Sequence, residues 1–476
     1  MVWFGVFFLF LYFRSYFFIT ANKGLEFDQT LFQTVANQLL HGRTLYNDIW
    51  ASKPPMIYVV GMINHYLPYR ILEFLLGVLT VFNIVSIAGN WLKKWWQVLA
   101  VLILFLTLFY NGLLYGRGGY TEEYGLQFLI LSITFLLKFH QNEQKKQLLF
   151  AGIFAATATL FKEPFVFSII PWWLFLVFTY NFKKWIPFVW GGLLGLLPFT
   201  FYLLFTGGVG GFLKYINYTS AYSKFLDLNL MQKLSIGLNK YLQIFEPIGS
   251  FAAFLPLLIF FAFLLPSTNK KLCLVIASQF VVELLSCCVS GYTFGHYFLQ
   301  MIFSYSIVSV VGVVSLTEFL QQRRFPFVNT ALLIFAVVFS YQNLNSFQQN
   351  GSKENPTLLA KPFEKTIEKY IPTGASVYID DPDLASFYLR NKYYTNSYIP
   401  IPVFHFFVIQ DDYAQVRFNI FKKTLIERPN QFIIQSSETL GLTNKYKDIK
   451  AFLLEKYEKI YDSKIENKGL IIWRLK

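Results

Sequence analysis

Long apolar runs separated by short polar loops dominate the first 342 residues of the chain. A run of about twenty apolar residues is long enough to cross the hydrocarbon core of a bilayer as a helix. On this basis we predict a mainly α, polytopic membrane bundle with about eleven spans. They lie near residues 1–19, 70–91, 95–114, 122–139, 147–161, 164–181, 185–205, 249–266, 271–290, 298–318 and 325–342.

Basic residues fall in alternate loops of this pattern. They are Lys93, Lys94, Lys138, Lys145, Lys146, Lys183, Lys184, Lys270, Lys271, Arg323 and Arg324. Lys and Arg in short loops mark the cytoplasmic side of a membrane protein. The remaining loops are therefore predicted to face outward, and they comprise residues 24–69, 111–121, 162–164, 206–248, 290–297 and everything after about 341.

The densest polar stretch of this membrane half runs from residue 24 to residue 56, in the first outer loop. Its apolar residues recur at helical spacing, which predicts an amphipathic helix over residues 28–40 lying on a membrane surface. Asp28 stands at the start of this helix, where an acid is favoured. Local chemistry leaves two roles equally open for Asp28: a helix N-cap, or a general base for an acceptor hydroxyl or amine.

Lys53 precedes the pair Pro54 and Pro55, which tends to start a new helix. A lysine held by stiff backbone at such a place suits a phosphate or pyrophosphate, and the alternative is an interfacial lysine that reaches toward lipid headgroups. Tyr46 and Asp48, between the two candidate residues, are expected to hold the loop together.

Two further polar clusters lie on the predicted outer side. Glu122 and Glu123 are adjacent on a helix and point in different directions, so at most one of them is expected to face a site. Lys162 and Glu163 stand at a tight turn, where they either neutralise each other or leave Lys162 to contact a phosphate.

A third cluster, His296 and Tyr297, opens a late span and is either an interfacial anchor or part of a site. We expect all these outer clusters to converge with Asp28. Glu283 lies in mid-span, where an ionised group needs a polar partner, and Arg14 in the first span is one candidate.

The composition changes to polar and mixed beyond about residue 345. Strand-like runs at 375–380, 431–435 and 470–473 alternate with helical patterns at 414–427 and 445–457. We therefore predict two domains: a transmembrane domain over 1–342, with a catalytic first outer loop at 20–69, and a small extracytoplasmic α/β domain over 343–476. The outer loop 206–248 is predicted to be a mobile, partly helical lid or docking surface.

Composition agrees with a membrane protein, since 55% of the residues are hydrophobic and only 14% are charged. The net charge of +14 does not indicate a nucleic-acid partner, because its excess lies mostly in short loops: residues 1–342 carry 22 Lys and Arg against 12 Asp and Glu. The three cysteines share one apolar segment, which indicates packing and no disulfide framework.

No clear metal-ligand set is present, so no cofactor is predicted. The richness in Phe, Lys and Asn is typical of a low-GC bacterium.

The order and shared sidedness of these elements resemble the GT-C membrane glycosyltransferases. The likeness is to glycosyltransferase family 39, the bacterial relatives of dolichyl-phosphate-mannose protein mannosyltransferase and of the lipid A aminoarabinose transferase. It rests on Asp28, the run GRTLYNDIWASKPP at 42–55, the Thr-Glu-Glu at 121–123 and the GHYFLQ at 295–300, and it covers roughly residues 1–340.

This resemblance implies inverting transfer of a sugar from a polyprenyl-phosphate donor to a lipid, glycan or protein acceptor. The reaction would take place on the outer face of the bacterial cytoplasmic (inner) membrane. Asp28 matches the family's first-loop catalytic aspartate, Lys53 matches its donor-phosphate lysine, and His296 with Tyr297 match a late His-Tyr element. Gln29 departs from the common Asp-Glu pair, which removes a second carboxylate from that position.

Two other function classes stay open from sequence alone. A transporter or flippase of lipid-linked sugars would use the same partners, although the outer-face clustering of polar residues argues against a path across the bilayer. A membrane-anchored binding protein would act through its soluble domain alone.

Overall fold

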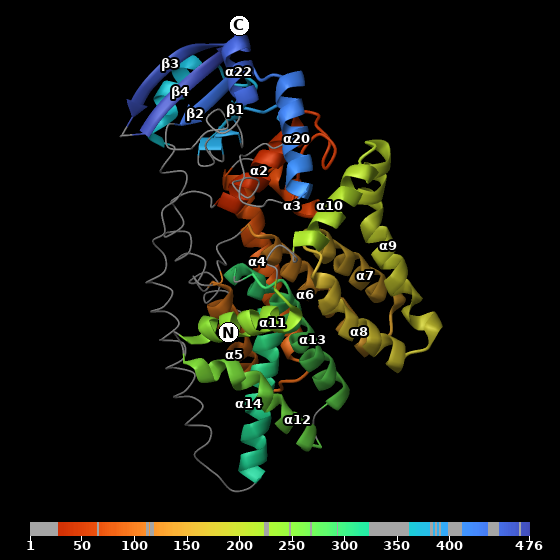
Figure 1. Ribbon diagram of the computed structural model, residues 1–476. Coiled ribbons are helices and arrows are strands. Elements are labelled where there is room, and N and C mark those ends of the chain that lie inside the picture. Colours follow the sequence, from red (N-terminus) through yellow and green to blue (C-terminus); the bar gives the residue numbers. More distant parts are fainter. Residues whose placement is uncertain are drawn as a thin grey trace. The chain divides into compact units, whose positions relative to one another are not determined.

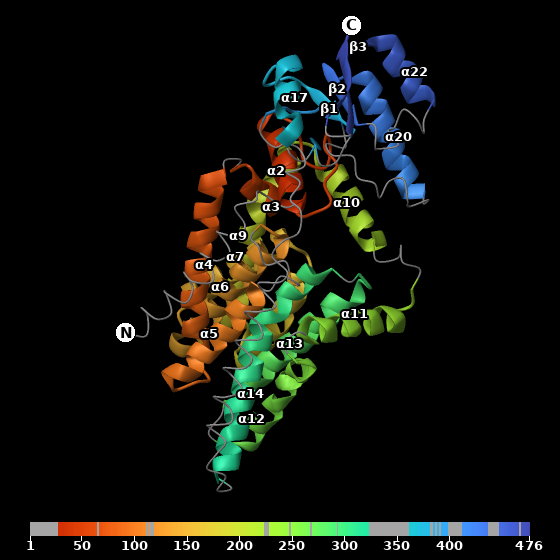
Figure 2. The same ribbon diagram turned by 90° about the vertical axis from the view of Figure 1, so that its left-hand side faces the viewer.

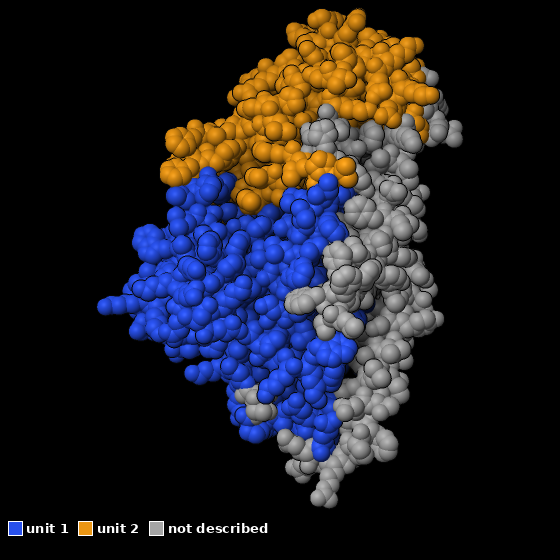
Figure 3. Space-filling view, turned by 180° about the vertical axis from the view of Figure 1, so that it is seen from behind, with its two compact units in different colours: residues 1–20, 70–200, 226–353 blue, residues 21–69, 201–225, 354–476 orange. Residues whose placement is uncertain are grey.

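The protein is described here from a computed structural model, which divides into two compact units (Figure 3). Unit 1 comprises residues 1–20, 70–200 and 226–353, and unit 2 comprises 21–69, 201–225 and 354–476. The described residues are 27–63, 66–110, 114, 119–222, 228–246, 249–266, 269–292, 294–322, 361–380, 384–385, 388–389, 392–397, 412–436, 447–465 and 468–476. The predicted spans at 1–19 and 325–342, and with them Arg14, lie outside these ranges.

Unit 1 is a bundle of apolar helices (Figure 1). Its elements are α4 (Tyr66–Ala88, from residue 70 on), α5 (Trp95–Phe109), α6 (Thr121–Asn142), α7 (Lys145–Phe161), α8 (Phe165–Thr179), α9 (Phe182–Phe205, to residue 200), α11 (Leu230–Phe245), the 3-10 helix η2 (Ser250–Ile259), α12 (Phe260–Leu264), α13 (Lys270–Val289), the 3-10 helix η3 (Gly295–Met301) and α14 (Ile302–Gln322). Helix α6 packs along α7, α13 packs on α8, α11 and α14, and α14 also packs on α5 and η2.

Helices occupy every predicted span that falls within the described ranges, so a membrane helical bundle is confirmed. By length and composition, four of the described helical segments could each cross a membrane: Leu67–Ala88, Phe182–Phe205, Lys270–Val289 and Gly295–Gln321. A fifth is reached if α11 is counted with the segment over 250–264. The total number of eleven spans stays a prediction.

The predicted span at 249–266 differs from a regular α-helix. It is a 3-10 helix, η2, followed by the five-residue helix α12. Pro256 lies inside η2 and has no backbone N–H to donate. Gly312 of α14 lets this irregular backbone approach closely, because a Cβ at that position would lie 2.6 Å from backbone atoms of Leu258 and Ile259.

Glycines also set the packing of α7 against α9. A Cβ on Gly152 would meet the carbonyl oxygen of Phe188 at 2.0 Å, and one on Gly191 would meet the carbonyl oxygen of Leu149 at 2.0 Å. At Gly192 nothing lies within 4 Å. The two helix backbones are therefore in direct contact along a small-residue stripe, as is common between membrane helices.

Gly191 lies in this contact and its neighbour Gly192 does not, so the two glycines make a matched pair for a test. We expect Gly191→Ala to destabilise the protein by about 1–3 kcal/mol through overpacking. Gly192→Ala should have no such effect, although both changes improve helix propensity equally. The midpoints of thermal unfolding in detergent measure the difference, and equal midpoints for the two variants would contradict the packing.

Unit 2 contains a four-stranded sheet with strand order β1-β2-β4-β3. Strands β1 (Val377–Ile379) and β2 (Phe432–Ser436) are parallel, whereas β4 (Lys468–Leu475) is antiparallel to both β2 and β3 (Tyr457–Ile465). The unit also holds α2 (Phe27–Leu40), α3 (Met56–Gly61), α10 (Val209–Tyr222), the 3-10 helix η4 (Lys361–Phe363), α17 (Glu364–Tyr370), α20 (Asp412–Glu427) and α22 (Lys447–Lys456).

Helices cover both faces of this sheet, which is seen nearly edge-on in Figure 2. On one face Ile367 of α17 packs with Val377 and Ile379 of β1. On the other face Tyr378 packs with residues of α20 and α22. Successive residues of β1 thus serve opposite cores, as the two-residue period of a strand requires.

The sequence pattern predicted β1, β2, β4, α20 and α22 correctly and missed β3 and α17. Strand β3 escapes the pattern because it lies at the edge of the sheet and carries charged residues along its length. Edge strands commonly carry such charges, which oppose pairing with another chain. The boundary predicted at residue 343 stays a prediction. Unit 2 joins the C-terminal residues with 21–69 and 201–225.

Candidate functional site

Asp28 lies in the first turn of α2 and is half-buried. The predicted helix is confirmed, but its placement on a membrane surface is not, because most of its polar side chains are buried along with its apolar ones. The buried polar residues are Gln29, Thr30, Gln33, Thr34, Asn37 and Gln38. Polar side chains on a surface helix would face water. Helix α2 is instead an interior helix over most of its length.

The polar face of α2 is hydrogen-bonded to the C-terminal part of unit 2. The side-chain amide of Asn37 donates to the carbonyl oxygens of Leu389 and Tyr393, both at 2.9 Å. The side-chain oxygen of Gln38 accepts the backbone N–H of Thr395 at 2.9 Å. These bonds satisfy buried polar groups on both sides and hold α2 against Leu389, Tyr393 and Thr395.

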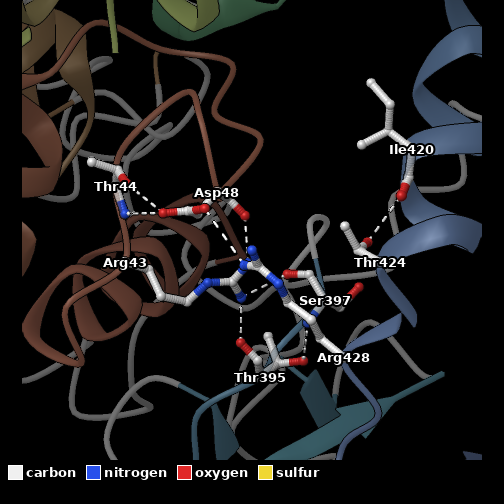
Figure 4. A network of polar contacts seen from close by, with 8 residues as sticks. All are labelled: Arg43, Thr44, Asp48, Thr395, Ser397, Ile420, Thr424 and Arg428. Carbon is white, nitrogen blue, oxygen red and sulfur yellow. Dashed lines mark hydrogen bonds and ion pairs between the residues drawn. The ribbon is translucent and has the colours of Figure 1, made fainter. Parts of the chain in front are cut away.

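Arg43 extends this attachment beyond the end of α2 (Figure 4). Its guanidinium donates to three backbone carbonyl oxygens, those of Asp48, Thr395 and Ser397, the last at 2.9 Å. The carboxylate of Asp48 in turn accepts hydrogen bonds from the side chain and, at 3.0 Å, the backbone N–H of Thr44. One arginine therefore joins the first loop to the segment 395–397, a network that the sequence pattern did not reveal.

Burial, hydrogen bonds and nearby charges together shift the pKa values of Arg43 and Asp48. Burial lowers the pKa of Arg43 to about 10, although the neighbouring Asp48 raises it. Arg43 is therefore a cation at neutral pH. Burial alone would raise the pKa of Asp48, but the hydrogen bonds from Thr44 and the nearby Arg43 and Arg428 outweigh it, so the pKa lies below its ordinary value of 3.8.

The lowered pKa of Asp48 predicts acid sensitivity of this attachment. Ionised Asp48 stabilises the fold fully above pH 3.8, and that stability is lost as the pH falls through the folded-state pKa. We expect Asp48→Asn to lower the free energy of unfolding by about 1.5–3 kcal/mol at pH 7, typical of a hydrogen bond to a charged group. The stability difference from the wild type should shrink below pH 3.8. The thermal midpoints of wild type and variant, measured from pH 7 down to acid pH, give this stability difference. The control is Asp462→Asn, a change at an exposed acid. A stability difference that does not depend on pH would contradict the proposed role of ionised Asp48.

Lys53 is half-buried, and its backbone is held from both sides. Its carbonyl oxygen accepts the phenol O–H of Tyr46 at 2.9 Å, and its N–H donates to the phenol oxygen of Tyr58 at 3.2 Å. Helix α3 begins at Met56 directly after the two prolines, as predicted, but it is only six residues long.

Helix α3 is in close contact with α2. A Cβ on Gly61 would lie 2.9 Å from the carbonyl oxygen of Phe32, and the rings of Phe32 and Tyr58 meet edge to face at 6.1 Å. Helix α2, which carries Asp28, is thus packed against α3, which begins three residues after Lys53, in unit 2.

Unit 1 holds a buried cluster around Glu122. This carboxylate forms an ion pair with Lys162, and His296 Nε2 lies 3.7 Å from it. The Lys162 ammonium also lies 3.7 Å from the centre of the Tyr297 ring, and His296 stacks on Tyr120 at 4.9 Å. Three predicted clusters therefore meet through Glu122, which is 1% exposed.

Glu123 has a different role from its neighbour. Its carboxylate accepts the backbone N–H of Tyr120 at 3.3 Å and caps the start of α6, whereas Glu122 faces Lys162 and His296. The prediction that the two adjacent acids point in different directions is confirmed. Glu163 is half-buried in the turn between α7 and α8.

Sequence reasoning missed a second buried ion pair. Arg70 and Glu73 on α4 are 2.6 Å apart and 2% and 5% exposed, and the phenol of Tyr124 lies 3.4 Å from Glu73. Their spacing of three residues inside an apolar span was the available signal, since charges within spans are seldom without a role.

Glu283 is fully buried in α13. Its carboxylate accepts hydrogen bonds from Gln279 at 2.8 Å and from Ser304, and Trp172 donates to Gln279 at 2.6 Å. The predicted need for polar partners is met by these side chains, whereas the candidate partner Arg14 lies outside the described residues.

Possible metal ligands do not gather in the described part of the chain. No group of three or more His, Cys, Asp or Glu side chains there is arranged to hold a metal ion. Cys273, Cys287 and Cys288 are buried and form no disulfide with one another.

The chain is similar to one protein-family model and to several solved structures. A family model, described as dolichyl-phosphate-mannose-protein mannosyltransferase, matches residues 53–205, the region that holds Lys53, Glu122 and Lys162. Among solved structures, ArnT from Cupriavidus metallidurans bound to undecaprenyl phosphate is similar over 98% of each chain, with a TM-score of 0.60 and 11% identity. The fold is that of the GT-C glycosyltransferases.

Two further structures share this GT-C fold. The apo state of the same ArnT matches 99% of this chain and 98% of its own, with a TM-score of 0.57 and 11% identity. The Archaeoglobus fulgidus oligosaccharyltransferase, in a complex with Zn and sulfate, matches 89% of this chain and 64% of its own, with a TM-score of 0.50 and 13% identity. No curated protein matches the chain.

The predicted GT-C resemblance and fold class are therefore confirmed, and the apolar helices indicate a membrane protein. The candidate residues divide between the two units. Asp28 and Lys53 lie in unit 2, and the cluster around Glu122 lies in unit 1. That all of them converge on one site stays a prediction, as does the role of each.

Proposed function

We propose that the chain is an integral-membrane glycosyltransferase that moves a hexose or pentose from a polyprenyl-phosphate donor to an acceptor. The acceptor is a lipid, glycan or protein on the outer face of the bacterial cytoplasmic membrane, and transfer inverts the anomeric carbon. The observation that carries the proposal is the likeness over 98% of the chain to a GT-C enzyme bound to undecaprenyl phosphate.

In this proposal Asp28 is the general base. Its half-buried carboxylate would take the proton of the acceptor hydroxyl or amine as the sugar–phosphate bond breaks. The hydrogen bonds of Asn37 and Gln38 support this role, because they fix α2 and with it the direction in which Asp28 points. A catalytic group on a rigid helix loses little activity to misplacement.

Lys53 and Lys162 would hold the donor phosphate. Both carry a point charge suited to phosphate, and the backbone of Lys53 is fixed by Tyr46 and Tyr58. Glu122 and the ring of Tyr297 stabilise the buried ammonium of Lys162. Glu123, Glu163 and His296 remain further candidates for the site.

The proposal is tested by incubating the purified protein with radiolabelled hexosyl and pentosyl polyprenyl phosphates and with envelope fractions as acceptor. We expect label to move from one donor to one acceptor fraction, with the opposite anomeric configuration in the product. Movement of the lipid-linked sugar across vesicle membranes with no product from any donor would contradict the proposal and favour a transporter.

A further inference from the structure

Helix α10 and the last residues of α9 contact the loop that carries Lys53, within unit 2. The backbone N–H of Leu45 donates to the phenol oxygen of Tyr202 at 2.8 Å. The ring of Tyr46 lies 5.0 Å from that of Tyr215 and 5.4 Å from that of Phe212. Residues more than 150 positions away in the sequence therefore hold the middle of the first loop.

Tyr46 is the centre of this contact. It has a φ of 66°, in the left-handed region that residues other than glycine rarely adopt, and it is 4% exposed. Such a conformation persists only where surrounding contacts enforce it. The rings of Phe212 and Tyr215 and the hydrogen bond to the carbonyl of Lys53 supply these contacts.

Gly211 brings α10 directly onto the backbone of Tyr46. A Cβ at Gly211 would lie 2.3 Å from the carbonyl oxygen of Tyr46 and 3.1 Å from the backbone nitrogen of Asn47, so no larger residue fits unless the backbone moves. At the preceding residue, Gly210, nothing lies within 4 Å. The contact is therefore specific to one face of the helix.

We propose that Tyr46 is a positioning residue for Lys53, and that α10 sets its position through Gly211, Phe212 and Tyr215. The chain of contacts runs from α10 to the ring and backbone of Tyr46, and from the phenol of Tyr46 to the carbonyl of Lys53. This inference rests on the proposed role of Lys53 in binding the donor phosphate. It implies that a displacement of α10 moves Lys53 and so changes the affinity for the donor.

Four variants test the proposal: Tyr46→Phe, Gly211→Ala, the matched control Gly210→Ala, and Lys53→Met. Tyr46→Phe removes a single oxygen and keeps the ring, so it tests the hydrogen bond even if Gly211→Ala does not fold. We expect Tyr46→Phe and Gly211→Ala to raise the KM for the polyprenyl-phosphate donor about fivefold, the effect of about one hydrogen bond, with kcat changed less than KM. Gly210→Ala should leave both unchanged.

Hydrogen exchange gives a second readout that needs no activity. The backbone amides of residues 44–53 should exchange faster in Tyr46→Phe and Gly211→Ala than in the wild type and Gly210→Ala. Unchanged exchange in both variants would overturn the inference. If Lys53→Met raises the donor KM while Tyr46→Phe and Gly211→Ala do not, the inference fails and the proposed function stands. If Lys53→Met leaves the donor KM unchanged, the proposed role of Lys53 itself fails.

Discussion

Replacing Asp28 with Asn is expected to lower kcat for sugar transfer by about 10² to 10⁴-fold, the usual contribution of general acid–base catalysis. Asparagine keeps the size of the side chain, but it is uncharged and cannot act as a base. The donor KM should change little, because the donor phosphate is assigned to the lysines. Initial rates of label transfer at saturating donor and acceptor measure the effect.

The control for this variant is Glu427→Gln, an equally small change at an exposed acid in α20 of the same unit. It should leave kcat unchanged. Asp28→Asn should also lower the free energy of unfolding by less than about 1 kcal/mol, the contribution expected of an acid in the first turn of a helix. The thermal midpoint should therefore change little. Transfer at the wild-type rate by a well-folded Asp28→Asn protein would refute the catalytic role.

Lys162→Met is expected to destabilise the protein by about 3–5 kcal/mol, because it leaves Glu122 buried without its cation. Lys184→Met is the matched control, since its partner Glu143 and Lys184 itself are both exposed, at 53% and 39%. An exposed pair contributes less than about 1 kcal/mol. Thermal midpoints in detergent compare the two, and equal losses would show that burial of the Lys162–Glu122 pair has no energetic consequence.

A double variant separates the stability of this pair from its function. Adding Glu122→Gln to Lys162→Met removes both charges, so stability should return toward that of the wild type. The donor KM should stay raised, because the ammonium proposed to contact the phosphate is still missing. A wild-type donor KM in the stable double variant would exclude Lys162 from phosphate binding.

Much of the local structure was predictable because it follows from periodicity and from backbone chemistry. Runs of apolar residues predicted most helices of unit 1, and strand-like runs predicted three of the four strands. The proline pair after Lys53 predicted the start of α3, as proline favours the first turn of a helix and cannot continue one. The position of Asp28 in the first turn of α2 followed from the same local rules.

Long-range contacts were not predictable from these patterns. Arg43 looked like an ordinary loop arginine, yet its guanidinium binds carbonyl oxygens of residues 352 and 354 positions further along the chain. The pair Arg70 and Glu73 was hidden in an apolar span, and Tyr46 gave no sign of its left-handed backbone. The contacts of Arg43 and Tyr46 have no local signature, because each depends on a partner from another element. The pair Arg70 and Glu73 did have one, its spacing of three residues on a single helix.

By itself, the sequence determined that the chain is a membrane helical bundle with a GT-C likeness. Which residues carry the chemistry stays a prediction. Hydrophobic periodicity and the scarcity of charge are local properties, so they can be read along the chain. The tertiary structure alone decided that α2 is an interior helix and that Glu122 unites Lys162 with His296. It also decided that α10 holds the loop of Lys53. The reason is physical: a buried polar side chain is stable only with a partner, and the fold determines which residue that partner is.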